Sequence, residues 1–131
     1  MPHLTLSILE SPLAVVRMAP TAAVPEWAWA GDLSSVTRTA DELSIVCDDA
    51  SVPPDLDAPA QRGWRALKVQ GPLDFSLTGV LAALTDPLAR ASISIFALST
   101  YDTDYLLVRA DDLVRACEAL TQAGHTVLQS A

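Results

Sequence analysis

Residues 92–109 read SISIFALSTYDTDYLLVR, and this stretch decides the fold. Apolar side chains recur along 92–100 with the period of two that is typical of a β-strand. The polar run 101–104 follows, where Asp favours a turn through local hydrogen bonds. Apolar residues return at 105–109, so the stretch predicts a β-hairpin.

The residues before the hairpin predict a strand and an amphipathic helix. Alternating apolar residues over 64–70 indicate the strand, which Gly71 terminates. Asp74 or Ser76 can cap the helix that follows. Pro87 is expected to kink this helix because a proline removes one backbone hydrogen bond. The helix itself is predicted from leucines that share one face, namely Leu77, Leu81, Leu84 and Leu88.

The residues after the hairpin predict a second helix and a last strand. Asp111 or Asp112 can cap this helix, Gly124 marks its end, and residues 125–129 form the strand. The buried stripe of the helix is predicted to contain Leu113, Cys117 and Leu120. The order of strand, helix, strand, strand, helix and strand predicts a ferredoxin-like α+β fold with both helices on one face of an antiparallel sheet.

The chain repeats itself approximately. Residues 37–43 resemble residues 100–106 at an offset of 63 residues. The repeat predicts two units, residues 1–63 and residues 64–131. Prolines interrupt the first unit and leave room for little more than a short helical turn around 25–27. We therefore expect a degenerate N-terminal unit and a complete βαββαβ unit in the C-terminal half.

Composition excludes several classes of function. The formal charge is −8 and the eight Lys and Arg residues are scattered, which argues against nucleic acid as a partner. Cys47 and Cys117 lack metal-ligand spacing, so we expect two core residues, no metal and no cofactor. No apolar run approaches the roughly 20 residues of a membrane-spanning helix, and we expect a cytoplasmic protein without a membrane contact.

Two stretches resemble a known family. Residues 71–79 read GPLDFSLTG, and residues 98–108 read LSTYDTDYLLV. Together with the first strand pattern and residues 37–47, they resemble bacterial tandem ACT-domain proteins, which are related to the ACT modules of aspartate kinase and to the CASTOR arginine sensors. The resemblance implies two ferredoxin-like ACT units with antiparallel sheets, the second complete and the first degenerate.

The resemblance also implies a ligand site. In that family an amino acid binds at an interface between ACT units, held by the loop after the first strand and by strand-edge backbone of the facing unit. The arginine sensors carry an acidic ligand contact in this loop where Ser76 stands here, so arginine specificity is not transferred. The ligand-binding candidates are Gly71, Leu73, Asp74, Phe75, Ser76, Leu77, Thr78, Gly79, Ser99 and Thr100.

The chemistry of the loop suits a small zwitterion. Gly71 and Gly79 allow close approach of the backbone, and free N–H groups at the start of the next helix can receive a carboxylate. Asp74 can receive the ammonium group. The alternative interpretation is that Asp74 or Ser76 only caps the helix and that the glycines only turn the chain.

Other acidic residues have a structural interpretation. Asp102 and Asp104 lie in the predicted turn, which explains them better than a metal or an acid–base role does. The pairs Asp48-Asp49 and Asp111-Asp112 are predicted to cap helices rather than to bind a metal.

These observations predict a regulatory module rather than an enzyme. The expected function is binding of an amino acid or similar metabolite between ACT units, across a homodimer. The alternative is a structural dimerisation module without a ligand. An enzyme would need Cys47 or Cys117 exposed beside His3 or His125.

Overall fold

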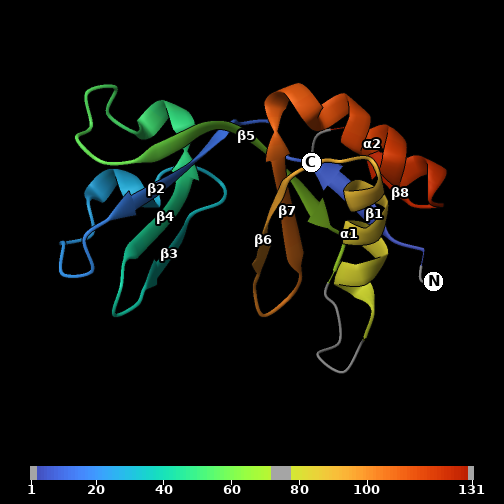
Figure 1. Ribbon diagram of the computed structural model, residues 1–131, viewed down its shortest axis with the longest axis horizontal. Helices are drawn as coiled ribbons and strands as arrows, with labels where there is room; N and C mark the ends of the chain where they lie inside the picture. The colour runs from blue at the N-terminus through green and yellow to red at the C-terminus, as the bar shows by residue number, and fades with distance from the viewer. Residues whose placement is uncertain (1–2, 72–77, 130–131) are drawn as a thin grey trace. The chain divides into compact units, whose positions relative to one another are not determined.

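The computed structural model describes residues 3–71 and 78–129, and the chain forms two compact units (Figure 1). The inserted unit is Ser11–Trp64, and the helical unit combines Met1–Glu10 with Arg65–Ala131. The long strand β5 (Ala60–Val69) contributes its first half to the inserted unit and its second half to the helical unit.

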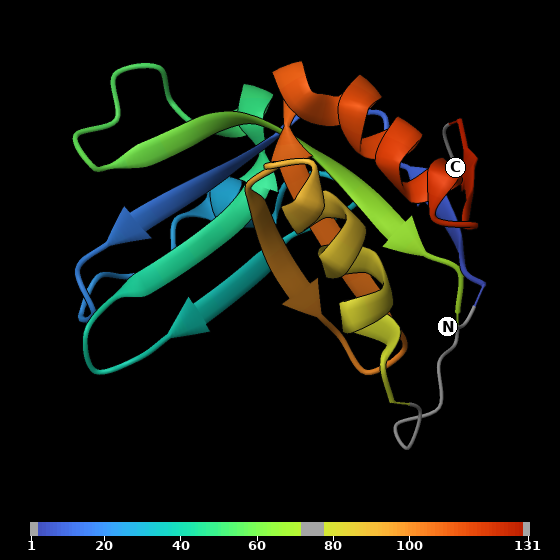
Figure 2. The same cartoon turned by 45° about the vertical axis from the view of Figure 1, so that its right-hand side comes forward.

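The helical unit is a sheet with two helices on one face (Figure 2). Its strand order is β6-β7-β5-β1-β8. β1 is antiparallel to β5 and parallel to β8, and β6 is antiparallel to β7. This arrangement confirms the predicted ferredoxin-like α+β fold. The bounds are β1 Thr5–Ile8, α1 Val80–Arg90, β6 Ile95–Ser99, β7 Asp104–Arg109, the 3-10 turn η3 Ala110–Asp112, α2 Leu113–Gln122 and β8 Thr126–Leu128.

Helix α1 begins later than the leucine pattern predicted. Its N-cap residue is Gly79, with φ of +77° and no side-chain cap hydrogen bond, and the predicted cap candidates Asp74 and Ser76 lie outside the described residues. Leu81 is 37% exposed. The buried face follows three- and four-residue spacing from the true start of the helix and consists of Val80, Ala83, Leu84 and Leu88.

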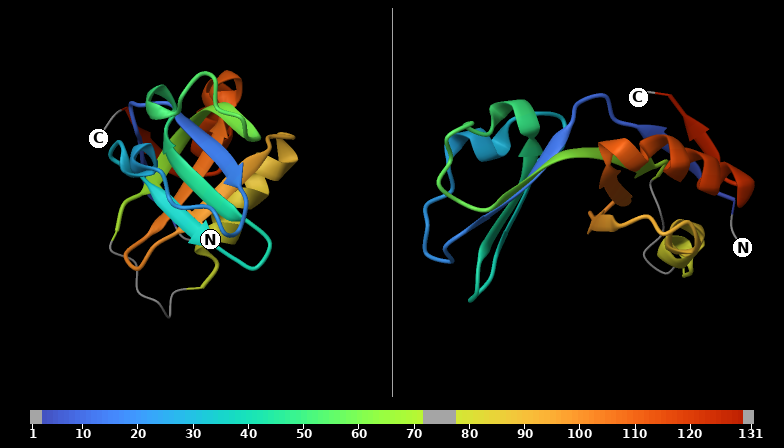
Figure 3. Two further views of the ribbon diagram at one scale, coloured as in Figure 1. Left: turned by 90° about the vertical axis from the view of Figure 1, so that its left-hand side faces the viewer. Right: turned by 45° about the horizontal axis from the view of Figure 1, so that its top comes forward.

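The position of strand β1 does not follow the expected division into residues 1–63 and 64–131, because β1 lies in the unit formed by residues after 64. It lies between β5 and β8 in the helical unit (Figure 3). Leu6 stands opposite both Val69 and Val127. Leu4, Leu6 and Ile8 are buried in the core of that unit. The alternation of these residues predicted a strand correctly, but alternation carries no information about which strands lie beside it.

The inserted unit repeats the fold with almost no helix. Its strand order is β3-β4-β2-β5, and short 3-10 turns stand where the other unit has helices. The prolines of the first unit had predicted this near-absence of helix. A buried cluster that includes Val16, Leu43, Ile45 and Cys47 forms its core. The bounds are β2 Leu13–Met18, η1 Glu26–Trp29, β3 Ser35–Arg38, β4 Leu43–Asp48 and η2 Asp49–Ser51.

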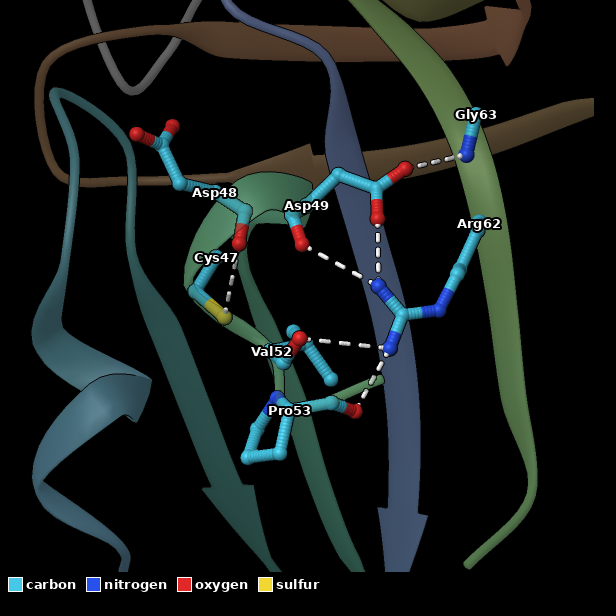
Figure 4. Close-up of polar contacts among 7 residues, drawn as sticks. All are labelled: Cys47, Asp48, Asp49, Val52, Pro53, Arg62 and Gly63. Atoms are coloured by element: carbon cyan, nitrogen blue, oxygen red, sulfur yellow. Dashed lines mark hydrogen bonds and ion pairs between the residues drawn. The ribbon is translucent and has the colours of Figure 1, made fainter. Parts of the chain in front are cut away.

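The acidic pairs do not cap helices with their side chains. Asp48 precedes η2 and Asp112 precedes α2, and neither makes a side-chain cap hydrogen bond. Asp112 instead accepts a hydrogen bond from Arg115 at 2.9 Å. The carboxylate of Asp49 accepts bonds from Arg62 and from the backbone of Gly63 (Figure 4). Asp48 and Asp112 therefore occupy the predicted N-cap positions, but they do not cap the helices through their side chains.

Candidate functional site

The described part of the predicted site lies at one end of the helical unit. Gly71 follows β5, Thr78 and Gly79 precede α1, and Ser99 and Thr100 follow one another at the end of β6. All five are exposed. The remaining candidates lie outside the described residues, namely Leu73, Asp74, Phe75, Ser76 and Leu77.

A buried threonine links the β6–β7 turn to the end of β5 by a hydrogen bond. The hydroxyl of Thr103, which is only 4% exposed, donates a 2.7 Å hydrogen bond to the carbonyl of Val69 at the end of β5. Two residues later the chain reaches Gly71. The β6–β7 turn is thus fixed beside the start of the Gly71–Gly79 segment. Sequence reasoning missed Thr103 because it stands in a polar run, where turn propensity gives no indication of burial.

The turn that follows β6 is closed by local hydrogen bonds. The backbone N–H of Thr100 donates to the carbonyl of Thr103 at 2.8 Å, and the Thr100 hydroxyl donates to the same carbonyl at 3.1 Å. Ser99 donates a 2.6 Å hydrogen bond to the carboxylate of Asp104. Asp104 therefore has the local role that the turn interpretation predicted.

The end of β5 is also fixed from the other side. Gln70 donates a 2.7 Å side-chain hydrogen bond to Ser7 of β1, and its backbone N–H donates to Thr5 at 2.8 Å. Ser7 is only 3% exposed. The end of β5 is therefore tied to β1 by two hydrogen bonds directly before Gly71.

The start of α1 presents the positive end of the helix dipole. The first N–H groups of an α-helix have no partner within the helix, and Gly79 offers no side chain that could cap them. Gly79 accepts the first helical hydrogen bond, from Ala83 at 2.9 Å. A carboxylate is the group that such a terminus favours.

Both thiols have raised pKa values. Burial, together with the negative charges of Asp48 and Asp49, raises the pKa of Cys47 from 9.0 to about 11. Burial also raises the pKa of Cys117. Each thiol is thus held in its neutral form, whereas the thiolate is the nucleophile.

A separate cleft of about 580 Å³ lies between the two helices. Small residues line it. Ala83, Pro87 and Ala91 lie on the α1 side, and Ala119 and Ala123 lie on the α2 side. The buried His125 also lines it. Within residues 3–71 and 78–129, no cluster of three potential metal ligands is found and no helix is long and apolar enough to cross a membrane.

Comparisons with known proteins match the fold and the two units. A family model described as the ACT domain matches residues 60–122, and a second model, described as an N-terminal domain, matches residues 12–55. The human protein named cytosolic arginine sensor for mTORC1 subunit 1 is 36% identical over 84 residues. That match covers 60% of this chain but only 26% of the human protein, so the chain spans about a quarter of the length of that relative.

Solved structures extend the match to the whole chain. Protein Atu0741 from Agobacterium tumefaciens is 40% identical, with a TM-score of 0.92 and coverage of 100% of this chain and 96% of that one. The regulatory subunit of aspartate kinase from Thermus thermophilus shares the fold, with a TM-score of 0.62, 12% identity and coverage of 88% and 93%. The chain is an ACT-domain protein and belongs to the same family as Atu0741.

Proposed function

We propose that this protein is a regulatory module that binds an amino acid at the Gly71–Gly79 segment, together with Ser99 and Thr100. The proposed site lies at an interface between ACT units in a homodimer, and the protein acts in the cytoplasm without catalysing a reaction. The observation that carries the proposal is the Thr103–Val69 hydrogen bond, which holds the β6–β7 turn beside the start of the candidate loop.

The chemistry of the exposed groups supports a zwitterionic ligand. The start of α1, where the N-cap residue Gly79 has no side chain, suits a carboxylate. Asp74 is the sequence candidate for the ammonium group, and Ser99 and Thr100 add hydroxyl groups at the strand end. The relatives support the same class, since one is named an arginine sensor and another a regulatory subunit.

The direct test is a thermal-shift screen of the proteinogenic amino acids, followed by calorimetry of any that shift the melt. A ligand at about 100 times its dissociation constant stabilises the folded state by about 2.7 kcal/mol. Asp74→Ala is expected to abolish the shift. Asp86→Ala is the matched control, because the contact recorded for Asp86 is an exposed ion pair with Arg90 on α1, and its loss should leave the shift unchanged.

Two results would contradict the proposal. If no amino acid shifts the melt at millimolar concentration, amino-acid binding is wrong. If both aspartate variants respond to the ligand as the parent protein does, the ligand binds elsewhere.

The second candidate is a dimerisation module without a ligand. The edge strand β8 favours it, because this strand pairs only with β1 among the described residues and Leu128 on it is 45% exposed. Light scattering separates the two functions. The structural module gives a dimer whose mass and stability do not respond to any amino acid, and Asp74→Ala then changes stability alone.

A further inference from the structure

His125 connects three parts of the helical unit. Its side chain is 5% exposed. Its Nδ1 accepts a 3.1 Å hydrogen bond from the backbone N–H of Leu4, at the start of β1. Its Nε2 lies 3.0 Å from the carbonyl of Ala83 in the first turns of α1. The next residue, Thr126, begins β8 and donates its backbone N–H to Leu4 at 2.9 Å.

The bond to α1 replaces one that the helix cannot make. In a regular helix the carbonyl of Ala83 would accept the N–H of residue 87, but Pro87 has no N–H. The buried Ala83 carbonyl would then be unsatisfied at a cost of about 1–3 kcal/mol. His125 supplies the missing donor, which explains how a proline is tolerated inside α1.

These partners allow a single protonation state of the imidazole. The N–H of Leu4 can only donate, so Nδ1 must be unprotonated. The carbonyl of Ala83 can only accept, so Nε2 must carry the proton. A protonated ring has N–H groups at both positions and would point one of them at the N–H of Leu4.

The neighbouring histidine has no such conflict. Nδ1 of His3 contacts the carbonyl of Gly124, and Nε2 lies 3.0 Å from the hydroxyl of Thr126. A hydroxyl both donates and accepts, so His3 keeps its partners in either charge state. The His3 and His125 rings stack with centroids 6.4 Å apart.

The cleft between the helices gives protons a route to His125. Asp86 and Arg90 of α1 line that cleft and form an ion pair of 3.0 Å with each other, while α2 contributes Gln122 and alanines to the lining. Among the described residues, the charged or titratable groups that line this cleft with His125 are Asp86 and Arg90, and His3 stacks on the His125 ring.

We propose that His125 is a proton-sensitive clasp between the start of β1 and the first turns of α1. The neutral ring closes the clasp through Leu4 and Ala83. Protonation of Nδ1 breaks the bond to Leu4, displaces the ring from Ala83 and loosens the pairing of β8 with β1. The clasp also reaches the candidate loop, because Ala83 donates to Gly79, yet it operates whether or not the loop binds a ligand.

The first test measures hydrogen exchange of the intact chain between about pH 8 and about pH 5, corrected for intrinsic rates. We expect the opening equilibrium of the Leu4 and Thr126 amides to rise about tenfold on acidification, which corresponds to about 1.4 kcal/mol. His125→Gln keeps a hydrogen-bond donor and an acceptor at this position, but the amide does not gain a proton. This variant should therefore lack the rise in opening on acidification. His3→Gln, the matched control, should keep it.

The second test keeps His125 and changes its partner. Pro87→Ala restores a backbone donor for the Ala83 carbonyl, so the α1 amides should become insensitive to pH while Leu4 stays sensitive. Nitrogen NMR of the imidazole should show the proton on Nε2 at neutral pH. The clasp is refuted if that proton is on Nδ1, if the parent protein shows no change in exchange, or if His125→Gln responds as the parent does. Equal responses of α1 in the parent and in Pro87→Ala would refute the link to α1.

Discussion

Among single residues, Gly31 is the position where the backbone requires glycine most strictly. Its φ is +97°, and a Cβ placed there would lie 2.4 Å from the carboxylate of Asp48. An L-residue in the left-handed region costs about 1–2 kcal/mol. We expect Gly31→Ala to lower the free energy of unfolding by about 2–3 kcal/mol in urea denaturation, because the buried carboxylate must also move.

Gly63 provides the matched control for the steric part of this loss. Its φ is +76°, but a Cβ there would meet no atom within 4 Å. Gly63→Ala should therefore show the backbone cost alone, about 1–2 kcal/mol. Adding Asp48→Ala to Gly31→Ala should recover the difference. Equal losses for the two alanine variants would show that the contact with Asp48 has no energetic effect.

The buried thiol of Cys47 makes stability depend on alkaline pH. Its folded pKa of about 11 exceeds the ordinary 9.0, so the unfolded chain loses this proton first as pH rises. The stabilisation is complete below about pH 9 and is lost towards pH 11, with a limit of about 2.7 kcal/mol.

Denaturation of Cys47→Ala from pH 8 to pH 11 measures this dependence, because the variant should lack that component of the decline. The two proteins compared, with and without Cys47→Ala, should both carry Cys117→Ala. The pKa of Cys117 is raised too, and its titration would otherwise add to the decline. Parallel stability curves for the two proteins would contradict the assignment. At neutral pH we expect slow labelling of Cys47 by thiol reagents in the folded protein.

At the scale of elements, the sequence predicted those elements whose pattern is local. The hairpin 92–109 and the helix before Gly124 follow from periodicity and turn residues, and both are present. The start of α1 was misplaced because Leu77 matches the helical period although the helix begins at Val80. Periodicity cannot exclude a residue that fits the spacing but lies beyond the end of a helix.

The η2 segment of the inserted unit depends on one arginine. Arg62 donates to the carboxylate of Asp49 at 2.7 Å and to its carbonyl at 3.1 Å. It also donates to the carbonyls of Val52 and Pro53 at 3.3 and 2.8 Å (Figure 4). The planar fork of a guanidinium makes this set, and an ammonium group cannot reproduce it. We expect Arg62→Lys to lose about 1–2 kcal/mol of unfolding free energy, nearly as much as Arg62→Ala.

Arg17 is the control for the Arg62 prediction. Its side chain donates an exposed hydrogen bond to the carbonyl of Asp41 at 3.1 Å, so Arg17→Ala should cost less than about 0.5 kcal/mol in the same chemical denaturation. Full stability of Arg62→Lys would mean that the positive charge, rather than the geometry of the guanidinium, holds η2. Asp49→Asn, which keeps an acceptor for Gly63, separates the charge from the hydrogen bond.

At the scale of the whole molecule, the path of the chain was the feature least accessible from sequence. The repeat located a boundary beside the true one at Trp64, because both halves carry the same strand pattern. It could not show that residues 3–10 belong with residues beyond 64. Likewise, the candidate site was indicated by glycines and the family motif, whereas the buried hydroxyl of Thr103 depends on the approach of β5 and β7.

The path of the chain gives a prediction about which unit a mutation weakens. Leu6 is fully buried in the core of the helical unit, so Leu6→Ala should cost about 2–5 kcal/mol. Native-state hydrogen exchange should then rise mainly in α1, α2 and β8, more than 70 residues away in sequence. Ile45→Ala is the reciprocal variant, since Ile45 is fully buried in the inserted unit and should affect β2, β3 and β4. If Leu6→Ala raised exchange first in β2 to β4, β1 would belong with its neighbours in sequence, and the pairing of β1 between β5 and β8 would be wrong.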